Sequence, residues 1–147
     1  MDIYSKPVNE TKTKLSRLFQ MKVRETLDKP GRALGVVWDS RTPLVKGFEN
    51  NYSYIVNFKV VGNAAGNHYH HKKQELLYPL LGSFKVILED IQTKEREEIE
   101  LNADQHQAIY FPPKIAHVIV AQTNPAIFIV TANYPASEED EFPYKLI

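Results

Sequence analysis

The chain has no cysteine, no excess of charge of either sign and no long hydrophobic run. Without cysteine there can be no disulfide, thiolate zinc site or cysteine nucleophile, so any metal must be bound by nitrogen and oxygen atoms. Basic and acidic residues number 18 each, so no net field favours nucleic acid or an anionic membrane surface, and we expect neither as a partner. No run is long enough to span a membrane and the first residues do not resemble a signal peptide, which predicts a cytoplasmic protein.

What the sequence does contain is short apolar or alternating segments separated by turns. At 147 residues the chain has the size of one domain. The segments predicted to be strands are residues 53–61, 75–81, 83–91, 97–102, 107–111, 117–123 and 126–134. Many short strands at this spacing predict an all-β sandwich or closed barrel, and nothing resembles βαβ alternation. We therefore expect one domain over residues 1–147.

Three segments outside these strands need separate interpretation. Residues 15–27 fit a strand, through Phe19, Met21 and Val23, but they also fit one face of a helix; the turn sequence DKPG that follows favours a hairpin. A polar N-terminal arm at residues 1–14 would precede the barrel at 15–147. Both this arm and the acidic segment 137–142 are predicted to be solvated surface.

The histidines are clustered, with three of the five at positions 68, 70 and 71. Unpaired imidazoles are costly in an interior, so the cluster indicates a metal site, a proton-transfer site or exposed surface. In an extended strand His68 and His70 share one face and His71 points to the other. Glu75 opens the next predicted strand, which we expect to pair beside the first, and His117 begins another apolar strand. Three imidazoles and a carboxylate suit zinc, iron(II), manganese or nickel.

The spacing of these residues resembles that of the cupin superfamily. The first cupin motif, G-x5-H-x-H-x3–4-E-x6-G, is matched at every fixed position by Gly62, His68, His70, Glu75 and Gly82. The second motif is kept only in part: Pro112 and His117 fit, whereas the two glycines and the asparagine are replaced by His106, Lys114 and Ala121. The resemblance implies a single cupin jelly-roll barrel in which His68, His70, Glu75 and His117 are the metal ligands.

Within the cupins, the stretch GNHYHH is most similar to the cupin domain of capsular-polysaccharide nucleotide-sugar enzymes. It also resembles the sugar 3,4-ketoisomerases and, more distantly, the deoxysugar 3,5-epimerases. Those ketoisomerases usually carry glutamine where this chain has Glu75, and many of them use a histidine base without metal. The resemblance implies an epimerase or isomerase of nucleotide-linked keto sugars in surface-polysaccharide biosynthesis, and Glu75 favours its metal-binding branch.

Such an enzyme would need a proton carrier and cations for the substrate pyrophosphate. A base removes the acidified proton beside the carbonyl, and the resulting enediolate needs positive charge or hydrogen-bond donors. The candidate catalytic residues are His68, His70, Tyr54 and Tyr134, with Tyr110 a further candidate. If all four metal ligands were engaged, the carrier would have to be another group, such as a tyrosine. The candidate pyrophosphate-binding residues are Lys114, Lys72, Lys73 and Arg41.

Two other functions remain open at this point. Three histidines and a glutamate also suit the iron(II) of a dioxygenase. A cupin of this kind could instead bind a sugar or small acid without catalysis. For assembly we expect a homodimer, because the alternating stretch SRLFQMKVRE could add to the sheet of a neighbour; if it folds back on its own sheet, the chain would be a monomer.

Overall fold

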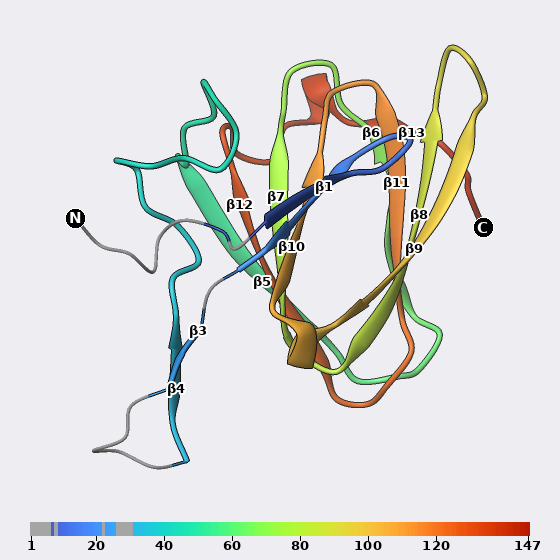
Figure 1. Cartoon of the computed structure of the whole chain (residues 1–147). Helices are drawn as coiled ribbons and strands as arrows, with labels where there is room; N and C mark the ends of the chain where they lie inside the picture. The colour runs from blue at the N-terminus through green and yellow to red at the C-terminus, as the bar shows by residue number, and fades with distance from the viewer. Residues whose placement is uncertain (1–6, 8, 22, 26–30) are drawn as a thin grey trace.

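The computed structural model describes residue 7 and residues 9–21, 23–25 and 31–147, and it is an all-β barrel (Figure 1). The larger sheet has six strands in the order β1 (Asn9–Lys12), β2 (Arg17–Gln20), β10 (Gln107–Phe111), β7 (Glu75–Leu81), β12 (Ala126–Ala132) and β5 (Tyr52–Phe58). The facing sheet has five, in the order β13 (Phe142–Pro143), β6 (Ala64–Tyr69), β11 (Ile115–Ala121), β8 (Ser83–Asp90) and β9 (Arg96–Asn102). This arrangement confirms the predicted cupin jelly roll.

The alternation in the sequence forms two cores. Inward residues of both sheets, including Leu77, Phe84 and Phe128, fill the barrel. The alternate residues of the larger sheet, among them Leu76 and Tyr78, form a second core on its outer face together with Val45 and Phe48 from the segment that precedes β5. Because side chains alternate along a strand, Glu75 faces inward like Leu77.

The N-terminal part confirms the hairpin interpretation and changes two other expectations. Strands β3 (Val23–Glu25) and β4 (Ala33–Gly35) pair as a hairpin, which extends away from the barrel in Figure 1; residues 26–30 of its connection lie outside the described residues. Residues 9–12 of the predicted arm are exposed, but they form β1. Strand β2 pairs with β1 and with β10 of the same chain, so the stretch expected to reach a neighbour folds back on its own sheet.

The predicted pairing of the Glu75 strand beside the histidine strand was wrong. Strand β6 lies between β13 and β11, whereas β7 lies between β10 and β12 in the opposite sheet. The five residues 70–74 cross from one sheet to the other, so Glu75 faces His68 and His70 across the barrel. Among the described residues, both helices are three-residue 3-10 turns, and no helix has the length and apolar character needed to span a membrane.

Candidate functional site

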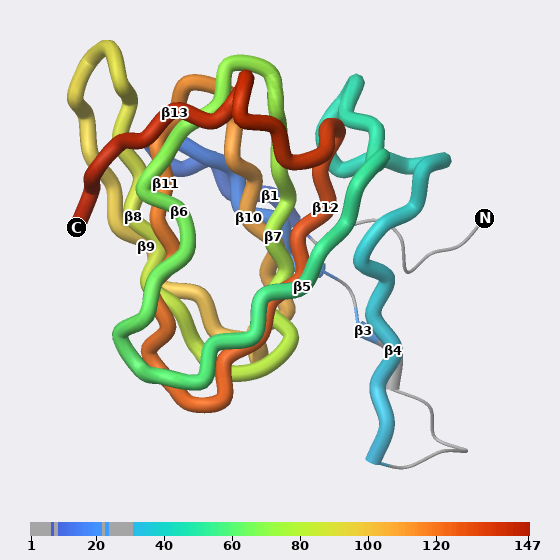
Figure 2. Tube along the Cα trace, turned by 180° about the vertical axis from the view of Figure 1, so that it is seen from behind, coloured from blue at the N-terminus to red at the C-terminus, as the bar shows by residue number. Residues whose placement is uncertain are grey.

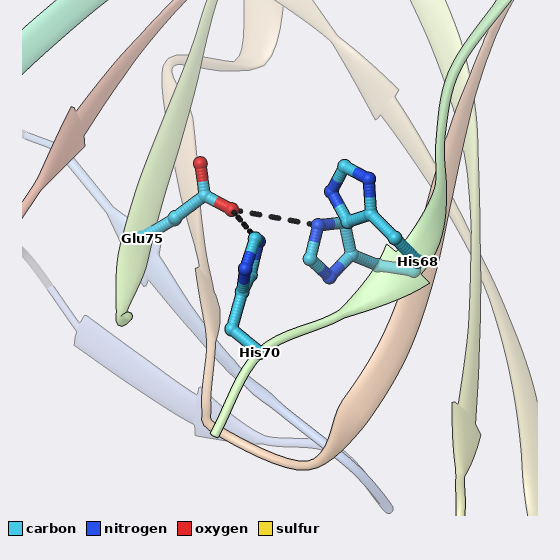
Figure 3. A group of neighbouring side chains, drawn as sticks. His68, His70 and Glu75 are labelled. Atoms are coloured by element: carbon cyan, nitrogen blue, oxygen red, sulfur yellow. Dashed lines mark ion pairs between the residues drawn. The ribbon is translucent and has the colours of Figure 1, made fainter. Parts of the chain in front are cut away.

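Four side chains from three elements meet inside one end of the barrel. His68 comes from β6, His117 from the adjacent β11, His70 from the residue just after β6, and Glu75 from the first position of β7. One potential ligand atom from each lies within 4.8 Å of the others. Figure 3 shows the Glu75 carboxylate directed toward the histidine rings from the opposite side. The structure therefore brings together all four residues that the sequence predicted as metal ligands.

A bulge at Gly66 places His68 beside His117. The register between β6 and β11 shifts at this point, and His68 then lies opposite His117. Gly66 has a positive φ of 116°, and a Cβ atom there would lie 2.5 Å from the carbonyl oxygen of His117. No side chain fits in that space, so only glycine lets the two strands approach as they do.

The deepest part of the cluster contains two histidines around one carboxylate oxygen. The Nε2 atoms of His70 and His117 lie 3.3 and 3.4 Å from Oε1 of Glu75. All three side chains are at most 6% exposed, whereas that of His68 is 22% exposed. The ring of Phe111 stacks on His117 with centroids 4.6 Å apart, which fixes the plane of this imidazole. His68 is thus the member of the cluster that is most accessible from the cavity.

Each of the three imidazoles has an oxygen atom beside its Nδ1. For His70 the oxygen is the carbonyl of Asp140 at 2.6 Å, and for His117 it is the carbonyl of Ile115 at 3.3 Å. Nδ1 of His68 lies 3.2 Å from a carboxylate oxygen of Glu141. A carbonyl can only accept, so Nδ1 of His70 and His117 donates, and their Nε2 atoms are directed to the cluster.

Burial and mutual charge give these groups different protonation states. Burial lowers the pKa of His68 to about 3, helped by the charges of His117 and His70, so His68 is neutral at physiological pH. Burial would raise the pKa of Glu75, but His117 and His70 hold it well below its ordinary value. Burial opposes protonation of His70, yet Glu75 and the Asp140 carbonyl together raise its pKa. The buried Glu75 is therefore ionised.

The second carboxylate oxygen of Glu75 has its own two neighbours. Tyr54 donates a hydrogen bond of 2.6 Å to Oε2, and Nζ of Lys73 lies 3.7 Å from the same atom. Burial, followed by the Glu75 charge, raises the pKa of Tyr54, so this hydroxyl keeps its proton. The buried Lys73 ammonium also lies 5.4 and 5.8 Å from the ring centroids of Tyr54 and Tyr52. The site thus holds a neutral phenol and an ammonium close to the cluster.

The donor set fits a divalent metal ion. Nε2 of His70 is buried, lies 3.3 Å from Oε1 of Glu75 and makes no hydrogen bond within the described part of the chain. Two ligands of a tetrahedral zinc ion, each about 2.1 Å from the metal, are roughly 3.4 Å apart, close to the separations around Glu75. With Nδ1 of each ring turned to an outer oxygen, the imidazoles have the orientation typical of metal-ligating histidines.

A cavity of about 340 Å³ opens beside the cluster, between the two sheets. Its polar lining is Tyr52, Tyr54, His68, Lys73, Glu75, His117 and Glu141, and apolar side chains such as Val56, Ile119 and Phe128 form the rest. Its size lies within the range of roughly 300–1,000 Å³ that is usual for small-molecule sites. The site therefore has room for a sugar-sized ligand next to His68.

The remaining residues predicted for the site do not line this cavity. Tyr134 and Lys72 line a neighbouring pocket of about 440 Å³, which shares Lys73 with the cavity. Tyr110 points to the second core on the opposite face of its sheet, because Ile109 and Phe111 on either side of it face inward. Lys114 is exposed and Arg41 forms a two-point ion pair with Asp39; neither lines the cavity.

The sequence interpretation missed the part that the acidic segment 137–142 plays in the site. Most of this segment is exposed, as predicted, but Glu141 lines the cavity and contacts His68, and Asp140 contacts His70. No sequence signal indicated this contact, because 70 residues separate Asp140 from His70 and the contact uses a backbone carbonyl.

Comparisons with known proteins agree with this architecture. The 3,4-ketoisomerase QdtA from Thermoanaerobacterium thermosaccharolyticum, solved as a variant with TDP-4-keto-6-deoxyglucose, is 21% identical; the match covers 89% of this chain and 88% of QdtA, with a TM-score of 0.73. The dTDP-6-deoxy-D-glucose-3,5-epimerase RmlC from Legionella pneumophila Philadelphia 1, in complex with dTDP-4-keto-L-rhamnose, is 14% identical; that match covers 95% of this chain and 78% of RmlC, with a TM-score of 0.79. At these identities the likeness establishes the fold alone.

No protein in the curated comparison matches the sequence. A family model described as "FdtA: WxcM-like, C-terminal" matches residues 12–143, which includes every strand from β5 to β13 and all four residues of the cluster. The cupin resemblance of the sequence is confirmed by the family model together with the similar structures. The chain belongs to the FdtA family, the WxcM-like C-terminal domains.

Proposed function

We propose that this chain is an epimerase or isomerase of nucleotide-linked 4-keto sugars, acting in the cytoplasm in surface-polysaccharide biosynthesis. The observation that carries the proposal is the neutral, accessible His68 at the wall of a sugar-sized cavity, beside a buried cluster of charge. Family membership supports it, as do two similar structures whose bound molecules are nucleotide-linked keto sugars.

His68 is the proton carrier in this proposal. A carbon beside a carbonyl is acidic enough for an imidazole to remove its proton, provided that the enediolate oxygen finds a positive partner. The Lys73 ammonium also lines this cavity and can donate to that oxygen. Return of the proton to the opposite face gives an epimer, and protonation of the old carbonyl carbon gives an isomer.

A divalent metal ion would be held by His70, Glu75 and His117, the three deeply buried members, with His68 free to move protons or to act as a fourth ligand. When bound, such an ion polarises a carbonyl as a Lewis acid. Epimerases of the related kind typically act without metal, so this part of the proposal rests on Glu75 and on the unpaired Nε2 of His70.

The nucleotide end of the substrate would lie toward the neighbouring pocket. Lys73 lines both spaces, and Lys72 and Tyr134 line the second one. An ammonium at the boundary suits a pyrophosphate that joins a sugar in the cavity to a nucleoside outside it. Lys114 and Arg41 line neither of these two pockets.

The test is incubation of the purified protein with a TDP-linked 4-keto-6-deoxy sugar, with product analysis by NMR and a simultaneous measurement of oxygen uptake. We expect an isomeric product and no oxygen uptake. Oxygen uptake by an iron-loaded sample would favour the dioxygenase alternative, and binding without conversion would favour the non-catalytic one.

Two matched variants separate the roles within the cluster. His68→Asn should abolish conversion and keep most of the bound metal, whereas His70→Asn should reduce metal content sharply; both would be measured by product NMR and elemental analysis. Conversion at the normal rate by His68→Asn would contradict the role given to His68.

A further inference from the structure

The C-terminal segment crosses the end of the barrel and holds residue 140 beside the histidines. Figure 2 shows this segment running from β12 across to β13, which pairs with β6. Phe142 lies opposite Tyr69 in that pairing and stacks on its ring, with centroids 5.2 Å apart. The amide of Tyr144 donates to the carbonyl of Asn67, one residue before His68. This pairing fixes the position of Asp140 next to the residues that follow β6.

The Asp140 carboxylate holds the turn between His70 and Glu75. It accepts hydrogen bonds from three successive backbone amides, those of His71, Lys72 and Lys73, at 2.9–3.2 Å. Partial burial opposes ionisation, but these bonds, that of Lys73 first, lower the pKa of Asp140. A carboxylate that accepts several amide hydrogen bonds is strongly anchored. The turn that carries Lys73 and leads to Glu75 is therefore attached to Asp140.

The backbone carbonyl of the same residue contacts His70. It accepts from Nδ1 of His70 at 2.6 Å, so this nitrogen carries a proton and Nε2 is the atom directed toward Glu75. The carbonyl and the carboxylate belong to one residue, so the bonds from the turn to the carboxylate help to hold the carbonyl against His70. One residue thus connects the orientation of a buried imidazole with the path of the four residues after it.

We propose that Asp140 is a positioning residue of the site: its carboxylate clamps the 71–73 turn so that its carbonyl fixes His70 with the proton on Nδ1 and with Nε2 facing the cluster. The inference deepens the proposed function because it concerns the same site, but its main measurements need no sugar. The competing explanation is that Asp140 merely closes a surface turn, in which case its loss would affect stability and leave His70 unchanged.

The test compares three variants of the full chain. Asp140→Ala removes the clamp, Asp140→Asn keeps one oxygen that can accept from the turn, and Glu138→Ala is the control because it removes one exposed carboxylate from the same segment. Two properties are measured: the protonation of the two ring nitrogens of His70, by ¹⁵N NMR at a pH where the ring is neutral, and the affinity for Zn²⁺, by calorimetry.

In the unaltered chain and in Glu138→Ala we expect one His70 tautomer, with the proton on Nδ1. In Asp140→Ala we expect a mixture of tautomers and a Zn²⁺ affinity roughly 10–100 times lower, the usual effect of losing support around a metal ligand. Asp140→Asn should lie between the two. An unaltered tautomer and affinity in folded Asp140→Ala would overturn the inference.

If Asp140→Ala does not fold, the unaltered chain provides the test on its own: a neutral His70 with its proton on Nε2 would contradict the role given to Asp140. Failure of the proposed function looks different. A protein that converts no keto sugar, but whose His70 tautomer depends on Asp140, would leave this inference standing and remove only the enzymatic activity.

Discussion

At the residue scale, the proposed metal dependence rests mainly on Glu75. In the sugar 3,4-ketoisomerases that the sequence resembles, glutamine usually stands at this position. Glu75→Gln keeps the size of the side chain and an oxygen that can accept from Tyr54, but it removes the carboxylate charge that strengthens the binding of a divalent metal ion.

For Glu75→Gln we predict a folded protein whose metal affinity is lower by roughly 10–100-fold. Elemental analysis and calorimetry measure the metal, and product NMR measures conversion. Conversion should fall together with metal occupancy. Full conversion by a metal-free Glu75→Gln protein would show that the histidines and Tyr54 suffice for catalysis. Glu75 would then have only a structural role, as the partner of the buried histidines.

The same cluster predicts how the stability of the metal-free protein depends on pH. Glu75 has a folded pKa well below its ordinary 4.5, so its contribution is present above about pH 4.5 and is lost as the pH falls through the folded value. His70 has a folded pKa above its ordinary 6.5, so its contribution is present below about pH 6.5 and is lost as the pH rises through the folded value. Asp140, whose pKa is lowered, adds to the loss in acid.

His68 acts in the opposite sense to His70: its pKa is lowered from 6.5 to about 3, so it opposes folding more and more as the pH falls below 6.5. We therefore expect the metal-free protein to be most stable near pH 6.5, with a decline on both sides. Urea unfolding at a series of pH values measures the free energy of unfolding. His70→Ala should flatten the decline on the alkaline side. A parent protein whose stability rises steadily through neutral pH would contradict this assignment.

At the element scale, the bulge at Gly66 decides whether β6 and β11 can present His68 and His117 side by side. Gly66→Ala would place a Cβ against the backbone of β11 in a conformation that non-glycine residues adopt at a cost of about 1–3 kcal/mol. Gly62→Ala is the matched control, because Gly62 also has a positive φ but open space around it.

We predict that Gly66→Ala lowers both the free energy of unfolding and the metal affinity, whereas Gly62→Ala lowers only the former. Thermal unfolding and calorimetry measure the two quantities. Equal effects of both variants would mean that the close approach of the two strands does not determine the geometry of the cluster.

Strands β5 and β7 to β12 could be predicted from the sequence because their apolar pattern is local, whereas β1 and β13 were predicted as solvated surface. In β7, however, Leu76, Leu77 and Tyr78 are all apolar, and only the structure shows that Leu77 faces one core and the other two face the second. The cluster itself was predicted from motif spacing, through His68, His70, Glu75 and His117. The pairing of the Glu75 strand was predicted wrongly, because alternation does not say which sheet a strand joins. The contacts of Asp140 and Glu141 depend on where the chain returns after β12, which no local pattern encodes.

At the scale of the whole molecule, the homodimer remains a prediction. Strand β2 is paired within its own sheet, so residues before about Asp28 would contribute to a dimer by contact or by exchange of an already formed strand. The β3–β4 hairpin is an argument for the dimer. It forms a separate two-stranded sheet, and an isolated sheet of two strands is only marginally stable in water, so a second chain packed against it would stabilise it.

Light scattering over a range of concentrations should give twice the mass of the chain. Removal of residues before Thr26 should abolish the dimer, and it should also destabilise the fold, because Phe19 and Met21 are buried. A monomer at all concentrations, or a dimer unaffected by the truncation, would contradict the prediction.

The most direct test of the central claim is deuterium exchange. The protein is incubated in D₂O with a TDP-linked 4-keto-6-deoxy sugar, and the hydrogens on the carbons beside the carbonyl are followed by NMR. The proposed chemistry predicts that the protein introduces deuterium at one of these carbons and that His68→Asn does so far more slowly. No exchange above the rate without protein, or equal exchange by His68→Asn, would contradict the claim that His68 moves protons in this cavity.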